Sequence, residues 1–233
     1  MKVMATLLAG AVALTTGTVW ASSGVQDSTE RLRMSSDTLE AMIHAPDKGI
    51  PEEVINDAKC IVVIPHLVKG AFVIGGQHGR GIATCRTKEG WSAPAFISIG
   101  GGSWGLQIGV EGVDLVMLVM NNHGLQRLLS SKFQIGADAS ASAGPVGRHA
   151  SAGTDWTMKT EILTYSRSNG IFAGISLDGA VVEQDQDSTR AIYGSDPSFH
   201  DTLSGEVHAP KSTHHFLKAI SEAARTSAVA EAK

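Results

Sequence analysis

Between Cys60 and Met120 the chain carries short runs of β-type residues that are separated by glycine-rich or polar turns. Regular spacing of such runs is typical of successive antiparallel strands. Glycines inside or beside the runs weaken a strand but permit bulges and sharp curvature. The sequence therefore predicts a strongly curved meander of six strands, with the runs CIVVIP, KGAFVIGG, RGIATCR, WSAPAFISI, SWGLQIGV and VDLVMLVM.

Helical patterns flank this β-rich region. Residues Asp27 to His44 place Leu32, Ser35 and Leu39 at helical spacing, and Lys211 to Ala230 carries a second apolar face. A short helix is predicted at 122–132, and further β-type runs follow it as FQIGADASASAG, MKTEILTYS, IFAGISL and AVVEQ. The predicted class is α+β, with a curved, partly barrel-like antiparallel sheet and flanking N- and C-terminal helices.

The first residues are typical of a secretory signal peptide. Lys2 precedes a short apolar run, and small residues surround Ala21. The run is shorter than the stretch of about 20 apolar residues that spans a bilayer. We therefore expect residues 1–21 to be a signal peptide that is cleaved near Ala21, residues 22–233 to form a single domain, and the product to be periplasmic or secreted, with peripheral membrane association.

The two cysteines, Cys60 and Cys85, would lie in an oxidising compartment if the protein is exported, which favours a disulfide. In a simple up-down-up meander they would lie at opposite ends of the sheet. A bond requires their strands to be antiparallel neighbours. The sequence leaves both arrangements open.

Catalytic and metal motifs are weak. The stretch GGGSWG at 100–105 fits both a dinucleotide fingerprint and a nucleophile elbow around Ser103, but both motifs must lead into a helix and the following residues are β-like. The nine histidines lack metal-ligand spacing. We therefore expect no cofactor, no metal and no catalytic residue.

Cations flank several predicted turns in the apolar, glycine-rich region, where an exposed backbone amide and a cation could bind a phosphate headgroup. The formal net charge of −4 argues against a nucleic-acid partner, because nucleic-acid-binding domains usually carry a basic excess. Any anionic partner must therefore meet a local patch of cations, for which the candidates are Lys69, Arg80, Arg86, Lys88, Lys132 and Arg148.

At these residues the chain resembles the SYLF, or Ysc84-like, domain family over about 30–225. The stretches that carry the resemblance are IVVIP, KGAFVIGGQHGRG, WSAPAFISIGGGSWGLQIG, GADASASAGPVGR and YSRSNGIFAGISLDG. The resemblance implies lipid binding, partly through an N-terminal amphipathic helix whose cations here are Arg31 and Arg33. Because the chain is predicted to be exported, we expect an anionic envelope phospholipid as ligand and do not expect actin binding.

The leading hypothesis is non-enzymatic binding of anionic phospholipid at a membrane surface in the cell envelope. A structural or protein-interaction role is the alternative, since ADASASAG at 137–144 could offer a flat strand for pairing. A serine hydrolase that uses Ser103 is the weakest hypothesis.

Overall fold

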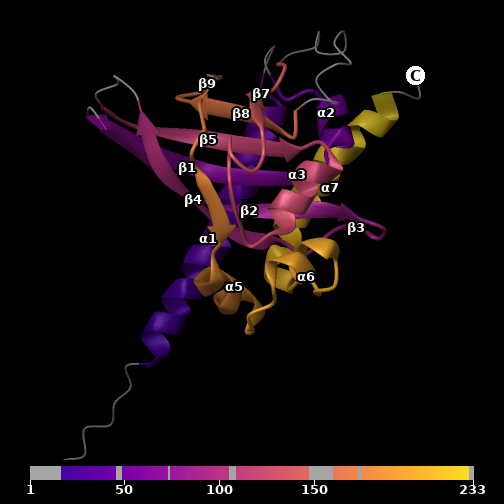
Figure 1. Ribbon diagram of the computed structural model, residues 1–233. Helices are drawn as coiled ribbons and strands as arrows, with labels where there is room; N and C mark the ends of the chain where they lie inside the picture. Colours follow the sequence, from indigo (N-terminus) through magenta and orange to yellow (C-terminus); the bar gives the residue numbers. More distant parts are fainter. Residues whose placement is uncertain are drawn as a thin grey trace, which may run out of the picture.

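Four long strands form the centre of the protein, which a computed structural model describes over residues 17–45, 49–72, 74–104, 109–146, 160–172 and 175–230 (Figure 1). They are β1 (Cys60–Phe72), β2 (Ile74–Thr87), β4 (Ala95–Trp104) and β5 (Gly109–Val119). The expected six-strand meander is wrong, because glycines between the predicted runs, such as Gly79 and Gly101, remain extended within β2 and β4 and do not end the strands. In addition, β5 pairs with β1, so the spatial order is β4-β2-β1-β5.

Shorter strands extend the sheet on both sides. The full order is β6-β10-β4-β2-β1-β5-β8-β7, with β3 beside β2 and β9 beside β8. Among the described strands, all pairings are antiparallel, as predicted, except that of β7 with β8, which makes the sheet mixed at this edge. Parallel neighbours need a long connection, which residues 144–161 provide. The additional strands are β3 (Gly90–Trp91), β6 (Lys132–Gln134), β7 (Ala141–Ala143), β8 (Ile162–Ser168), β9 (Ile171–Phe172) and β10 (Val181–Gln184).

The sheet curls into a half-barrel with a separate apolar core on each face. The inner core includes Ile64, Leu67 and Ile99, and helices α3 and α6 contribute Leu128 and Phe199 to it. The outer core lies beneath α1, α2 and α7. The predicted α+β class with a curled sheet and terminal helices is confirmed. The helices are α1 (Gly17–Ile43), α2 (Glu52–Asp57), α3 (Asn122–Leu129), α5 (Gln186–Tyr193), α6 (Phe199–Ser204) and α7 (His214–Ala230), which follows the short 3-10 helix η2 (Lys211–Thr213).

Helix α1 is amphipathic, as predicted, and its apolar face is already covered. Leu32, Leu39 and Met42 are at most 2% exposed and belong to the outer core. The helix begins at Gly17, so it runs continuously past the predicted cleavage site near Ala21. Within the described ranges, no helix combines the length and the apolar character needed to cross a membrane.

The disulfide joins the first two strands. Cys60 and Cys85 are direct partners across the β1–β2 hairpin, and their sulfur atoms are bonded at 2.06 Å. The two cysteines are connected by two long strands and not by three. Because β1 and β2 are antiparallel neighbours, the start of β1 and the end of β2 lie at the same end of the sheet. Both cysteines are at most 1% exposed and lie in the inner core.

The β1–β2 hairpin needs a glycine at position 81 because the bulged part of β1 approaches it closely. A Cβ atom at Gly81 would lie 2.3 Å from the Val63 carbonyl oxygen and 2.6 Å from Ile64 Cγ1. We expect Gly81→Ala to lower the free energy of unfolding by about 1–3 kcal/mol, as overpacking does. The control is Gly76→Ala on the same strand, where the nearest atom would be 3.9 Å away. Urea denaturation of both variants checks the prediction, and equal losses would contradict it.

Candidate functional site

A polar cleft of about 530 Å³ lies on the outer side of the sheet beside α5. Strands β2, β4, β6 and β10 contribute to its wall. Three cations and three carboxylates line it, namely Arg80, Lys132, Arg190, Glu183, Asp185 and Asp187.

Each cation of the cleft faces a carboxylate. Arg80 lies 3.5 Å from Asp27 of α1, and the Lys132 ammonium lies 3.2 Å from Glu183. The third cation, Arg190, lies 2.9 Å from Asp187. Arg80, Lys132 and Arg190 are all more than half exposed, so these ion pairs are well solvated and individually weak. The cleft therefore does not concentrate positive charge.

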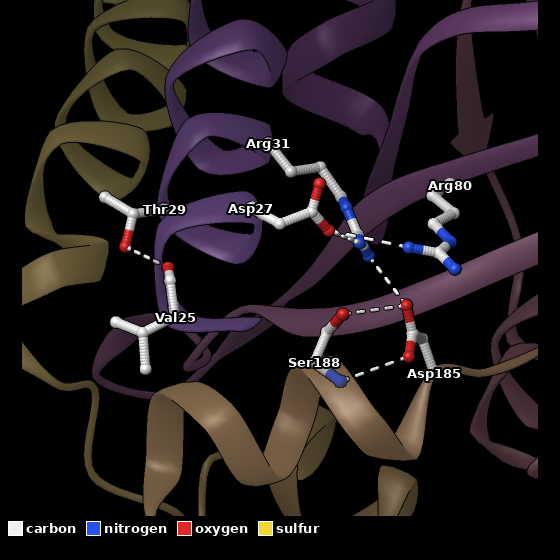
Figure 2. Close-up of polar contacts among 7 residues, drawn as sticks. All are labelled: Val25, Asp27, Thr29, Arg31, Arg80, Asp185 and Ser188. Carbon is white, nitrogen blue, oxygen red and sulfur yellow. Dashed lines mark hydrogen bonds and ion pairs between the residues drawn. The ribbon is translucent and has the colours of Figure 1, made fainter. Parts of the chain in front are cut away.

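A buried ion pair at the side of the cleft joins α1 to α5 (Figure 2). The Arg31 side chain is 6% exposed and donates to Asp185 at 2.8 Å and to Asp27 at 3.1 Å. Its guanidinium also lies 5.6 Å from the centre of the Phe96 ring on β4. Asp185 in turn caps α5 by accepting hydrogen bonds from the Ser188 amide and hydroxyl. Arg31 thus holds α1, α5 and the sheet together.

The Asp185 carboxyl group makes the stability of the protein depend on pH. Burial raises the pKa of the carboxyl, but hydrogen bonds from Arg31 and Ser188 outweigh burial, so the pKa lies below its ordinary value. A depressed carboxyl pKa contributes stability above the unfolded-state pKa of about 3.9, and this contribution is lost as pH falls through the folded-state pKa.

We therefore expect the free energy of unfolding of the protein to fall more steeply below about pH 4 than that of Asp185→Asn, which lacks the titrating group. Asparagine also caps helices well, so the comparison isolates the charge. Urea titrations between neutral pH and about pH 2.5 measure both curves. Parallel curves over this interval would contradict the assignment.

The other predicted lipid-binding cations do not gather around the cleft. On α1, Arg33 is exposed and forms ion pairs with Glu30 and Asp37. Arg86 donates to the carbonyl oxygens of Ala58 and Ile55 and lies over Trp91. Lys69 donates to the carbonyl oxygen of Ser176 on the inner side of the half-barrel.

Of the predicted cations that the structure describes, Arg80 and Lys132 line the cleft, and Arg31 lies buried beside it. Arg31 is buried, which differs from the surface position that the resemblance implies. Arg148 lies outside the described residues. Sequence reasoning missed Arg190, which lies on α5 beside Asp187.

Ser103 does not lie on a nucleophile elbow. It sits within β4 opposite Gly75 of β2, and the next described element is β5. A nucleophile elbow places its serine at a sharp turn from a strand into a helix, whereas the backbone here continues as a strand to Trp104. The structure gives the hydrolase hypothesis no support.

The ends of the four central strands bring apolar residues together. In the backbone register, Phe72 pairs with Ile74 across the β1–β2 hairpin, and Ile74 pairs with Trp104 at the end of β4. Strand β5 begins at Gly109, opposite Ala71. Figure 1 shows these strand ends at the left, on the side of the sheet away from α2, α3 and α7. We call Phe72, Ile74 and Trp104 the apolar strand ends.

Comparison with known proteins gives a consistent result. A protein-family model, Ysc84, described as "Las17-binding protein actin regulator", matches residues 100–223. SH3 domain-containing YSC84-like protein 1 of Rattus norvegicus is 32% identical over 169 residues, which are 72% of this chain and 49% of that protein. Protein YSC84 of Saccharomyces cerevisiae is 32% identical over 183 residues, 76% of this chain and 39% of that protein. The chain thus spans half or less of the length of these relatives.

Proposed function

We propose a function from the fact that the chain belongs to the Ysc84 family. The names in this family point to binding or regulatory proteins. The protein is a non-enzymatic binding domain that attaches to membrane surfaces containing anionic phospholipid, and its apolar strand ends enter the interface. The observation that carries this proposal is the backbone register that places Phe72, Ile74 and Trp104 side by side.

Apolar residues at neighbouring strand ends suit an interface between water and lipid. Tryptophan is enriched at the headgroup level of membranes because its ring is large and amphipathic. Full burial of one large apolar side chain contributes about 1.5–3 kcal/mol. Entry of two or three such residues is therefore sufficient for reversible binding.

Helix α1 is a less suitable membrane contact in this fold. Its apolar residues Leu32, Leu39 and Met42 are buried against the protein, so insertion of this face would require the helix to leave the sheet. Such a step would also break the buried Arg31–Asp185 pair. For this reason the proposal assigns membrane contact to the strand ends.

Cations contribute less to the proposed membrane binding than the sequence predicted. A cation close to an anionic membrane contributes about 1 kcal/mol, but Arg31, Arg33, Arg80 and Lys132 all face carboxylates. Lys69 lies on β1 near the apolar strand ends, and burial lowers the pKa of its ammonium while Glu111 opposes this shift. An anionic headgroup beside Lys69 would favour the charged form.

The proposed membrane is that of the cell envelope. The signal peptide predicted for residues 1–21 would deliver the domain to a periplasmic or secreted location, where phosphatidylglycerol or cardiolipin is the expected anionic lipid. The buried Cys60–Cys85 disulfide supports this proposal, because disulfides persist in oxidising compartments.

Vesicle flotation tests the proposal. We expect the protein to float with phosphatidylglycerol-containing vesicles at low salt. A double variant, Phe72→Ser with Trp104→Ser, should reduce the bound fraction at least tenfold, because each substitution removes an apolar side chain that would be buried in the membrane. The matched control is Ile171→Ser, which removes a 67% exposed apolar residue from β9. Binding should weaken moderately as salt rises. Equal flotation of the double variant and the control would refute the role of the strand ends, and failure of the unmodified protein to float would refute lipid binding.

A protein partner is the second candidate. It is favoured by the family description and by the name "LAS seventeen-binding protein 3" of a Saccharomyces cerevisiae relative that is 29% identical over 182 residues. Export would keep the chain from cytosolic actin, so actin binding is not expected here. Cross-linking in whole cells separates the two candidates, since cross-links to a protein of the envelope together with no flotation would favour the second.

A further inference from the structure

The half-barrel is open along a seam beside β7. This strand is the last in the described sheet order and pairs with β8 on one side only. A groove of about 270 Å³ is lined by β7, by Thr164 of β8 and, on the opposite side, by residues 175–178. The two walls belong to different parts of the chain, so an occupant of the groove would touch both sides of the seam.

The hydrogen bonds of β7 show which of its backbone groups point away from β8. In a parallel ladder, alternate residues direct both their amide and their carbonyl to the same neighbour. The Ser140 carbonyl accepts from Ile162, and the Gly144 amide donates to Thr164, so the even-numbered residues face β8. Ala141 and Ala143 therefore direct their amides and carbonyls away from β8. Within the described residues, these four groups have no hydrogen-bond partner.

We propose that an extended segment of a partner protein enters this groove and adds to the sheet as a strand beside β7. The amides and carbonyls of Ala141 and Ala143, which are unpaired among the described residues, recur at strand spacing, and another extended backbone offers matching groups at the same spacing. This proposal concerns a different surface from the apolar strand ends and does not depend on lipid binding.

The groove also indicates the side chains of its partner. Ser142 and Ser176 are exposed hydroxyl residues, and Asp178 is the one charged residue in the described lining. The Ser176 hydroxyl donates to Asp178, which holds the carboxylate at the groove. A segment of small or β-branched residues with a lysine or arginine near Asp178 fits this lining best.

Short synthetic peptides test the proposal with the full chain. The panel alternates valine and threonine and places one lysine at successive positions. We expect at least one peptide to slow amide hydrogen exchange at Ala141 and Ala143 about tenfold, measured by NMR, because their amides gain acceptors. The same peptide with N-methylated alternate amides should lose the effect.

The matched variants are Ala143→Pro and Ala143→Ser. Proline removes only the outward amide of β7 and leaves the bonds to β8, and edge strands tolerate it for that reason. We expect Ala143→Pro to weaken peptide binding about tenfold or more, because the proline ring removes one backbone hydrogen bond and keeps the peptide from approaching β7 closely. Ala143→Ser keeps the amide and should leave peptide binding within about twofold. Protection of the β8 amides checks that both variants keep the fold.

Three results would overturn the proposal. They are equal binding to Ala143→Pro and the unmodified chain, equal binding of the N-methylated peptide, and a panel in which no peptide protects Ala141 or Ala143. The N-methylated comparison uses the unmodified chain, so it decides the question even where the proline variant fails to fold.

Discussion

Replacement of Arg31 by methionine is expected to lower the free energy of unfolding by about 3 kcal/mol, because removal of one partner from a buried ion pair leaves the other charge uncompensated. Arg31 is 6% exposed and Asp185 is 12% exposed. The variant would leave the Asp185 carboxylate against α1 without its cation. For a chain of this size, the loss corresponds to a fall in melting temperature of about 6–12 °C. Urea and thermal denaturation measure it.

Arg33→Met on the same helix is the control for this prediction. Arg33 forms two ion pairs but is 55% exposed, so solvent screens these pairs and its replacement should cost much less stability than that of Arg31. A double variant, Arg31→Met with Asp185→Asn, should lose less stability than the sum of the two single variants, because it removes both charges. Equal losses for Arg31→Met and Arg33→Met would show that the buried pair does not fasten α1.

Joint replacement of Cys60 and Cys85 by alanine is expected to lower the free energy of unfolding by about 3 kcal/mol. The disulfide closes a loop with a sequence separation of 25, and in the chain-entropy model its loss gives the unfolded chain more freedom. Denaturant curves of the variant and the oxidised protein measure the difference.

Reduction of the native protein provides the control for the disulfide. Because both cysteines are at most 1% exposed, a reductant should reach the bond only through unfolding, and the folded protein should show no free thiol during a short incubation. Once reduced in urea, the protein should match the alanine variant. Identical midpoints for oxidised and reduced protein would contradict the prediction.

The sequence predicted the elements whose signal is local. The helical spacing of Leu32 and Leu39 correctly indicated an amphipathic helix, and the glycine-rich β runs indicated a curved sheet. The number of central strands was wrong because glycine was taken as a strand end, whereas Gly76 and Gly101 lie inside long strands. Whether a glycine ends a strand depends on the neighbouring strands, which local patterns do not contain.

The candidate site was less predictable because its contacts are distant in sequence. Arg31 and Asp185 are 154 positions apart, and the resemblance presented Arg31 as a surface cation. A charge on the polar side of a helix was taken to face solvent, but α5 packs against that side of α1. Arg80 and Lys132 were identified as candidates, while the carboxylates that face them were not.

Fluorescence quenching of Trp104 by brominated acyl chains tests the membrane-binding account most directly. The other three tryptophans of the chain, Trp20, Trp91 and Trp156, are replaced by phenylalanine, and vesicles of phosphatidylglycerol with brominated phosphatidylcholine are added at low salt. The account predicts strong quenching of Trp104 on binding, because the apolar strand ends enter the bilayer interface. Binding of the protein to the vesicles with unchanged Trp104 fluorescence would contradict it.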